Sequence, residues 1–83
     1  MVFLIEYDRK IGSIVRFDRF SDADRSRAQS TRLELELELN REGVEHEVVL
    51  LEAASEADLR RTHARYFKSL RELGEMISAA GNS

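Results

Sequence analysis

Arg32-Leu-Glu-Leu-Glu-Leu-Glu-Leu39 is the stretch that decides the fold of this chain. Its strict alternation of leucine and glutamate is the pattern of a β-strand with one apolar face. Its composition favours a helix instead, because leucine and glutamate are strong helix formers and no β-branched or aromatic residue interrupts them. Glutamates along one strand face would also repel one another. Pattern and composition therefore predict different elements.

The flanking residues favour the helix. Ser21, followed by Asp24, is typical of a capping box at a helix start, and Gly43 is the residue type expected just past a helix end. No glycine or proline lies between these positions. We therefore predict a helix over residues 22–41. The alternative is a β-hairpin that turns at Asn40-Arg41-Glu42-Gly43.

Such a helix carries two apolar stripes on nearly opposite sides. Ala28, Leu35 and Leu39 form one stripe, and Leu33 and Leu37 form the other. A single core covers only one of them, and leucines exposed together usually mark an interface. We therefore predict that Leu33 and Leu37 belong to an interface and that the protein is a homodimer.

The rest of the chain predicts three strands and a second helix. Residues 2–7 and 13–20 are rich in β-branched and aromatic residues and predict an antiparallel hairpin that turns at residues 8–12. Residues 44–53 include Val48-Val49-Leu50-Leu51, which is typical of a strand buried on both faces. Ser55 with Asp58 forms a second capping box, and the apolar spacing after it predicts a helix that reaches residue 79 or 80 unless Gly74 divides it.

This order of elements predicts one α+β domain over residues 1–83, with a ββαβα topology. The simplest closure is a three-stranded, mainly antiparallel sheet in the order 2-1-3, in which the second strand, first helix and third strand form a split βαβ unit. The two helices then cover either one face of the sheet together or one face each.

Composition narrows the classes of function. The chain has 83 residues, 16 acidic and 13 basic, and a net charge of −3, which argues against nucleic acid as a partner. The absence of cysteine excludes disulfides and thiolate chemistry. The amino terminus has no basic leader and no long apolar run, so we predict a cytoplasmic protein without a membrane anchor.

The segment from Leu59 to Phe67 is the richest in side chains capable of chemistry. Thr62, His63 and Tyr66 could line a small pocket, with Arg60 supplying positive charge to an anionic ligand. The alternative is that His63 packs at the edge of the core while the basic residues form a solvated face. The same basic face could contact phosphates, but its acidic neighbours and the net charge disfavour this. That face comprises Arg60, Arg61, Arg65, Lys68 and Arg71.

Other candidate sites have simpler explanations. His46 lies between Glu45 and Glu47, but strand alternation places its ring on the opposite side from both carboxylates, so we predict a solvent-facing histidine and no metal site. The sequence has no phosphate-binding glycine loop, nucleophile elbow or metal motif. We therefore expect neither catalysis nor a cofactor.

Glu47-Val-Val-Leu-Leu-Glu-Ala53, Ser55 and Leu59-Arg-Arg-Thr-His-Ala-Arg-Tyr-Phe67 together resemble a group of short uncharacterised bacterial proteins. That group shares a strand, a capped helix and a T-H-x-R-Y-F signature, which singles out Thr62, His63, Arg65, Tyr66 and Phe67. The resemblance implies no particular activity. We predict a non-catalytic, self-associating interaction or regulatory module; the alternative is a binder of a small anionic ligand near His63.

Overall fold

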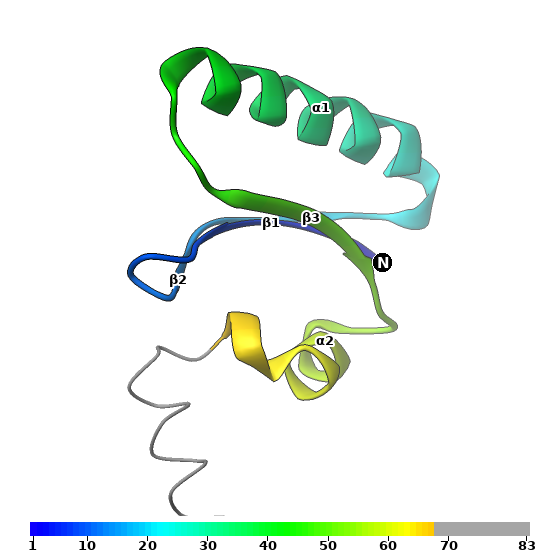
Figure 1. The fold of residues 1–83 in the computed structure, drawn as a ribbon. Helices are drawn as coiled ribbons and strands as arrows, with labels where there is room; N and C mark the ends of the chain where they lie inside the picture. The colour runs from blue at the N-terminus through cyan, green and yellow to red at the C-terminus, as the bar shows by residue number, and fades with distance from the viewer. Residues whose placement is uncertain (68–83) are drawn as a thin grey trace, which may run out of the picture.

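The computed structural model describes residues 1–67, which form a sheet between two helical layers (Figure 1). The elements are β1 (Val2–Asp8), β2 (Ser13–Phe20), the 3-10 turn η1 (Asp22–Asp24), α1 (Arg25–Glu42), β3 (Glu47–Glu52), α2 (Glu56–Thr62) and the 3-10 turn η2 (Ala64–Tyr66). The sheet has the order β2-β1-β3, and β1 is antiparallel to both neighbours. The predicted α+β class, strand order and split βαβ unit are confirmed.

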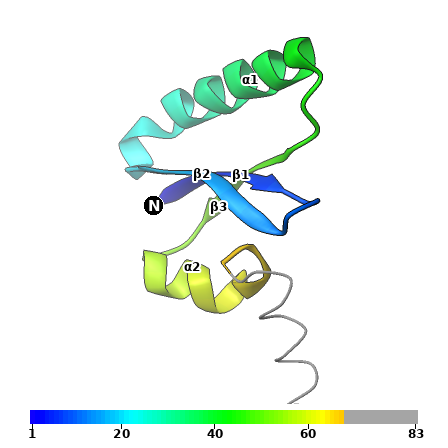
Figure 2. The ribbon, with the colours of Figure 1, turned by 90° about the vertical axis from the view of Figure 1, so that its left-hand side faces the viewer.

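The two helices cover opposite faces of the sheet, with α1 on one side and α2 on the other (Figures 1 and 2). Successive residues of β1 alternate between these faces, as a strand requires. The face toward α1 holds a cluster of Val2, Leu4, Phe20 and Ala28. The face toward α2 holds a cluster of Phe3, Ile5, Tyr7, Leu59 and Tyr66. The sequence left both helix arrangements open, and the structure has one helix on each face.

β1 is the centre of the core, because every residue from Val2 to Tyr7 is buried. β3 pairs only with β1 among residues 1–67 and is mostly half-buried, although both of its faces meet apolar clusters. The run from Val48 to Leu51 meets an apolar cluster on each face, as expected of a strand covered on both sides, but its side chains are only partly buried. The reason is position: β1 has a strand on each side, whereas β3 lies at an edge of the described sheet.

The predicted hairpin between β1 and β2 is confirmed. The Asp8 side chain accepts hydrogen bonds from the backbone N–H groups of Lys10, at 2.9 Å, and Ile11, at 3.4 Å. Gly12 has a φ of 67°, a conformation that favours glycine. Asp8 and Gly12 thus close the turn and set the start of β2.

The helical prediction for residues 22–41 is also confirmed, and the hairpin alternative is rejected. Gly43 ends α1 with a φ of 71°, and the Val44 N–H donates to the Leu39 carbonyl at 2.9 Å. The predicted start differs, because the Ser21 hydroxyl donates to the Asp24 carboxylate at 3.3 Å and caps no backbone N–H. A 3-10 turn, rather than a capping box, begins this segment.

The second helix starts as predicted but ends early. The Ser55 hydroxyl accepts a hydrogen bond from the Asp58 N–H at 3.1 Å, which confirms the cap. α2 stops at Thr62, and His63 has non-helical backbone angles. A continuous helix through His63 is therefore wrong. The change of direction lets Tyr66 pack on the sheet; the part of the prediction beyond residue 67 lies outside the described residues.

Candidate functional site

The outer face of α1 exposes two large apolar side chains on one helix. Leu33 and Leu37 are 56% and 59% exposed, whereas Leu35 and Leu39, which point toward the sheet, are 6% and 8% exposed. The sequence thus separated the two leucine stripes correctly. Packing within residues 1–67 does not explain the pair, because more than half of each side chain is exposed.

The surroundings of Leu33 and Leu37 are polar but largely uncharged. Ser26, Ser30 and Asn40 are exposed and share this side of α1 by helical spacing. We call these five residues the outer stripe. Charged residues border it, so the outer stripe resembles the apolar centre and polar rim of a small protein interface.

The four residues predicted to bind an anionic ligand have separate partners in the structure. Arg60 pairs with Glu56 at 3.6 Å and lies over the Phe67 ring, 4.6 Å from its centroid. The Thr62 hydroxyl donates to the Asp58 carbonyl at 2.9 Å, one turn back along α2. Both polar groups are therefore used locally. Neither group pairs with His63 or Tyr66 among the described residues.

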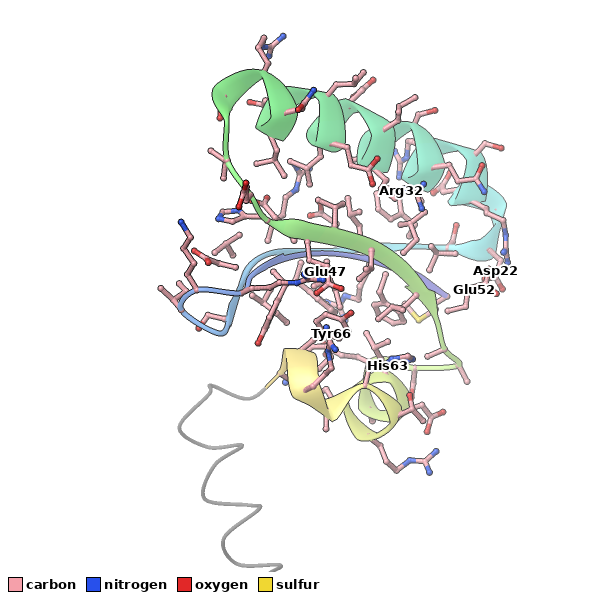
Figure 3. The ribbon with its side chains drawn as sticks, viewed as in Figure 1. Asp22, Arg32, Glu47, Glu52, His63 and Tyr66 are labelled. Atoms are coloured by element: carbon pink, nitrogen blue, oxygen red, sulfur yellow. The ribbon has the colours of Figure 1, made fainter. Side chains whose placement is uncertain are left out.

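Tyr66 is part of a polar network with Glu47, on the face of the sheet toward α2 (Figure 3). Its hydroxyl donates to the Glu47 carboxylate at 3.2 Å, and Arg65 and Arg9 reach the same carboxylate at 3.1 and 3.4 Å. The Tyr66 ring meets the Tyr7 ring edge to face at 5.3 Å. Tyr66 thus fastens η2 to the sheet.

Electrostatics within this network follow from its contacts. Burial alone would raise the pKa of Glu47, but hydrogen bonds and charge from Arg9, Tyr66 and Arg65 hold it below the usual 4.5. Burial, followed by the nearby Glu47 charge, raises the pKa of the Tyr66 hydroxyl above the usual 10.0. The phenol is therefore a stable hydrogen-bond donor to a stable carboxylate, which is the arrangement of a structural tie.

His63 lies at the end of α2 and is half-buried, with its backbone N–H bonded to the Leu59 carbonyl at 2.8 Å (Figure 3). Because the helix ends here, His63 and Tyr66 do not share one continuous helical stripe. The four candidate residues were grouped on the assumption of one continuous helix, and the structure does not have that helix. They are Arg60, Thr62, His63 and Tyr66. Ligand binding near His63 stays a prediction.

His46 is not the solvent-facing residue that we predicted, because its side chain is only 18% exposed. Its Nδ1 lies 2.5 Å from a Glu6 carboxylate oxygen, and its Nε2 lies 3.4 Å from an Asp8 oxygen. The sequence pattern considered only Glu45 and Glu47 as carboxylates near His46, and it could not show which carboxylates the neighbouring strand supplies. The strand register was the missing information.

Comparisons with known proteins add no relative: no family model, curated protein or solved structure matches this chain. The resemblance to short bacterial proteins stays a prediction. Among residues 1–67, no helix has both the length and the apolar character to cross a membrane. The same residues contain no group of three or more histidine, aspartate or glutamate side chains placed to hold a metal ion. A functional proposal for this chain therefore rests on the α+β fold and on α1, which has buried leucines on one side and exposed leucines on the other.

Proposed function

We propose that this protein is a non-catalytic interaction module that self-associates through the outer stripe of α1. The observation that carries the proposal is the pair Leu33 and Leu37, both more than half exposed on a helix whose opposite side is already buried. Exposed leucines at helical spacing, on a rigid helix, fit a second helix of the same kind. The proposed partner is a second copy of this chain.

The spacing of the outer stripe suits helix pairing. Its residues recur at intervals of four and three positions, from Ser26 through Ser30, Leu33 and Leu37 to Asn40. This is the spacing of the a and d positions that meet in two-helix packing. Serines at one end permit close approach of the helices, and Leu33 and Leu37 supply the apolar contact.

The bordering charges favour a parallel pair of α1 helices. In a parallel pair, a residue that borders the contact faces the residue five positions further along the other helix. Glu36 of one copy therefore faces Arg41 of the second copy. Two-fold symmetry provides this opposite-charge pair twice. An antiparallel pair centred on Leu33 and Leu37 would instead bring Glu36 close to its own counterpart. Charge complementarity therefore selects the parallel arrangement.

The size of the outer stripe predicts a weak, concentration-dependent dimer. Two leucines and three small polar residues are far fewer than the 20 to 30 residues a side of a stable interface of about 1,600 Å². Such an association responds to local protein concentration, a property that suits a regulatory or adaptor role. It does not require a reaction or a cofactor.

Sedimentation over a wide concentration range tests the proposal. The weight-average mass of the wild-type chain should rise with concentration, whereas that of the double variant Leu33→Gln, Leu37→Gln should stay at the monomer value. Glutamine is a good helix former, and both positions are exposed, so the variant should keep its fold.

The matched control is Glu34→Gln, Glu38→Gln, which changes two exposed residues of the same helix outside the outer stripe. This control should still associate. A wild-type chain that stays monomeric at all concentrations would contradict self-association. Association that survives in the leucine variant would instead place the interface elsewhere.

A further inference from the structure

His46 connects the segment that follows α1 to two carboxylates of the central strand. Glu6 is a buried charged residue, only 8% exposed, and its carboxylate lies 2.5 Å from His46 Nδ1. Asp8, at the end of β1, lies 3.4 Å from His46 Nε2. Each ring nitrogen therefore faces an anionic oxygen, and we call these three side chains the His46 cluster.

The strand register explains why these three side chains meet. Glu6 pairs with Val48 and Tyr7 with Glu47, so continuing the antiparallel register places His46 opposite Asp8. Side chains two residues apart on a strand point to the same face, which brings Glu6 into diagonal contact with the ring. The cluster thus follows from an extension of the sheet register by one residue into the connection that precedes β3.

The two carboxylate contacts favour the protonated form of the His46 ring. A neutral imidazole has one N–H donor and one acceptor nitrogen, and an acceptor nitrogen facing a carboxylate is repulsive. Only the imidazolium carries N–H groups on both nitrogens and can satisfy both acids. With both nitrogens directed at carboxylates, the ring has no free nitrogen to act as a catalytic base.

The His46 ring is accessible to solvent and can therefore gain or lose a proton. His46 lines two open surface cavities, of about 410 and 290 Å³, through which protons can exchange with water. The charged groups that face these cavities come from the β1–β2 turn, from α1 and from the residues adjacent to His46. They are Arg9, Lys10, Glu36, Glu45 and Glu47. Acids outnumber bases here once Glu6 and Asp8 are counted, so the local field also favours a positive ring.

The direction of the pKa shift agrees with this geometry. The hydrogen bond to Glu6 raises the pKa of His46 above its usual 6.5; burial opposes the shift, and the charges of Glu6 and Asp8 support it. Because the folded state holds the proton more tightly than the unfolded state, the extra stability is fully present below the unfolded pKa. It is lost as pH rises through the folded pKa.

We propose that the His46 cluster is a pH-sensitive clamp that fastens the α1–β3 connection to β1 when the ring is protonated and releases it when the proton is lost. Residues 43–46 form this connection, between the end of α1 and the start of β3. Deprotonation leaves the buried Glu6 and the adjacent Asp8 without a shared cation. The connection, and with it the end of α1, should then open more readily.

Two measurements test the clamp in the full chain. The first is an NMR titration of the two histidine rings, with His63→Gln used to assign the His46 signal. The His46 midpoint should lie above the ordinary value of 6.5 and should fall in Asp8→Asn. This variant removes the charge but keeps a side-chain oxygen for the turn.

The second measurement is the urea midpoint between about pH 5.5 and about pH 8.5, the range in which a histidine with a raised pKa titrates. The wild-type and His63→Gln chains should lose stability across this range, and His46→Gln should lose markedly less. Apart from the two histidines, all three chains have the same titrating groups. The difference between the pH profiles of the wild-type chain and His46→Gln therefore reports on His46.

Each outcome decides the proposal. A His46 midpoint at or below 6.5, or one that does not change in Asp8→Asn, would overturn the clamp. An unchanged pH profile in His46→Gln would do the same. If His46→Gln does not fold, the folded Asp8→Asn variant supplies the decision through the NMR midpoint. Every variant keeps the outer stripe and is compared at one protein concentration, so any stabilisation from self-association is common to them, and the clamp and the proposed function succeed or fail independently.

Discussion

Leu35→Ala and Leu33→Ala apply the same chemical change to two sides of one helix, and we expect very different costs. Leu35 is 6% exposed beneath α1, whereas Leu33 is 56% exposed on the outer stripe. Both substitutions replace one strong helix former with another, so helix propensity contributes almost nothing to the difference. The comparison therefore isolates burial.

Burial sets the expected magnitudes. Truncating a buried leucine removes its transfer free energy and leaves a cavity, which together cost about 2 to 5 kcal/mol. Leu35 is buried but belongs to neither core cluster, so we expect a cost in the lower half of that range, about 3 kcal/mol, for Leu35→Ala. An exposed substitution on the same helix should change stability by less than about 0.5 kcal/mol in the monomer.

Urea unfolding followed by circular dichroism at several protein concentrations is the appropriate assay. The cost of Leu35→Ala should be nearly independent of concentration. The cost of Leu33→Ala should be small in dilute solution and should grow as the dimer forms, because association stabilises only the folded chain. The concentration dependence thus separates packing within one chain from packing between copies.

Equal costs for the two variants in dilute solution would refute the assignment of the two helix faces. A Leu33→Ala cost that is large but independent of concentration would show that Leu33 packs inside its own chain. In that case the outer stripe would not be a site of self-association.

Two further predictions concern the cap of α2 and the acid limb of stability. Ser55→Ala should cost about 1 kcal/mol in urea unfolding, because its hydroxyl caps the Asp58 N–H, whereas Ser21→Ala should be nearly neutral because Ser21 caps no backbone group. A similar cost at both serines would contradict this difference. Glu47 has a lowered folded pKa, so its contribution is present above the usual 4.5 and is lost as pH falls through the folded value. Glu47→Gln should therefore make stability less sensitive to acid below about pH 4.5, and an unaltered acid titration of stability would show that the Tyr66 network is energetically unimportant.

Elements whose signals are local could be predicted from the amino-acid sequence. Helix-forming residues and Gly43 identified α1 despite the alternating leucines, and helical geometry alone separated Leu35 from Leu33. The strand order followed from connection rules, because a helix that joins parallel strands leaves room for β1 between them. These inferences succeeded because propensity, capping and short connections act over a few neighbouring residues.

Features that depend on distant partners could be seen only in the folded chain. α2 ends at Thr62, and the chain then turns so that Tyr66 contacts Glu47 and Tyr7 on the sheet. Helical periodicity in the sequence cannot predict these contacts. His46 meets Glu6 and Asp8 only because the pairing of β1 with β3 has one particular register. A shift of one residue would turn His46 to the other face of the sheet. The sequence could therefore single out His46 but could not predict that Glu6 and Asp8 are its partners.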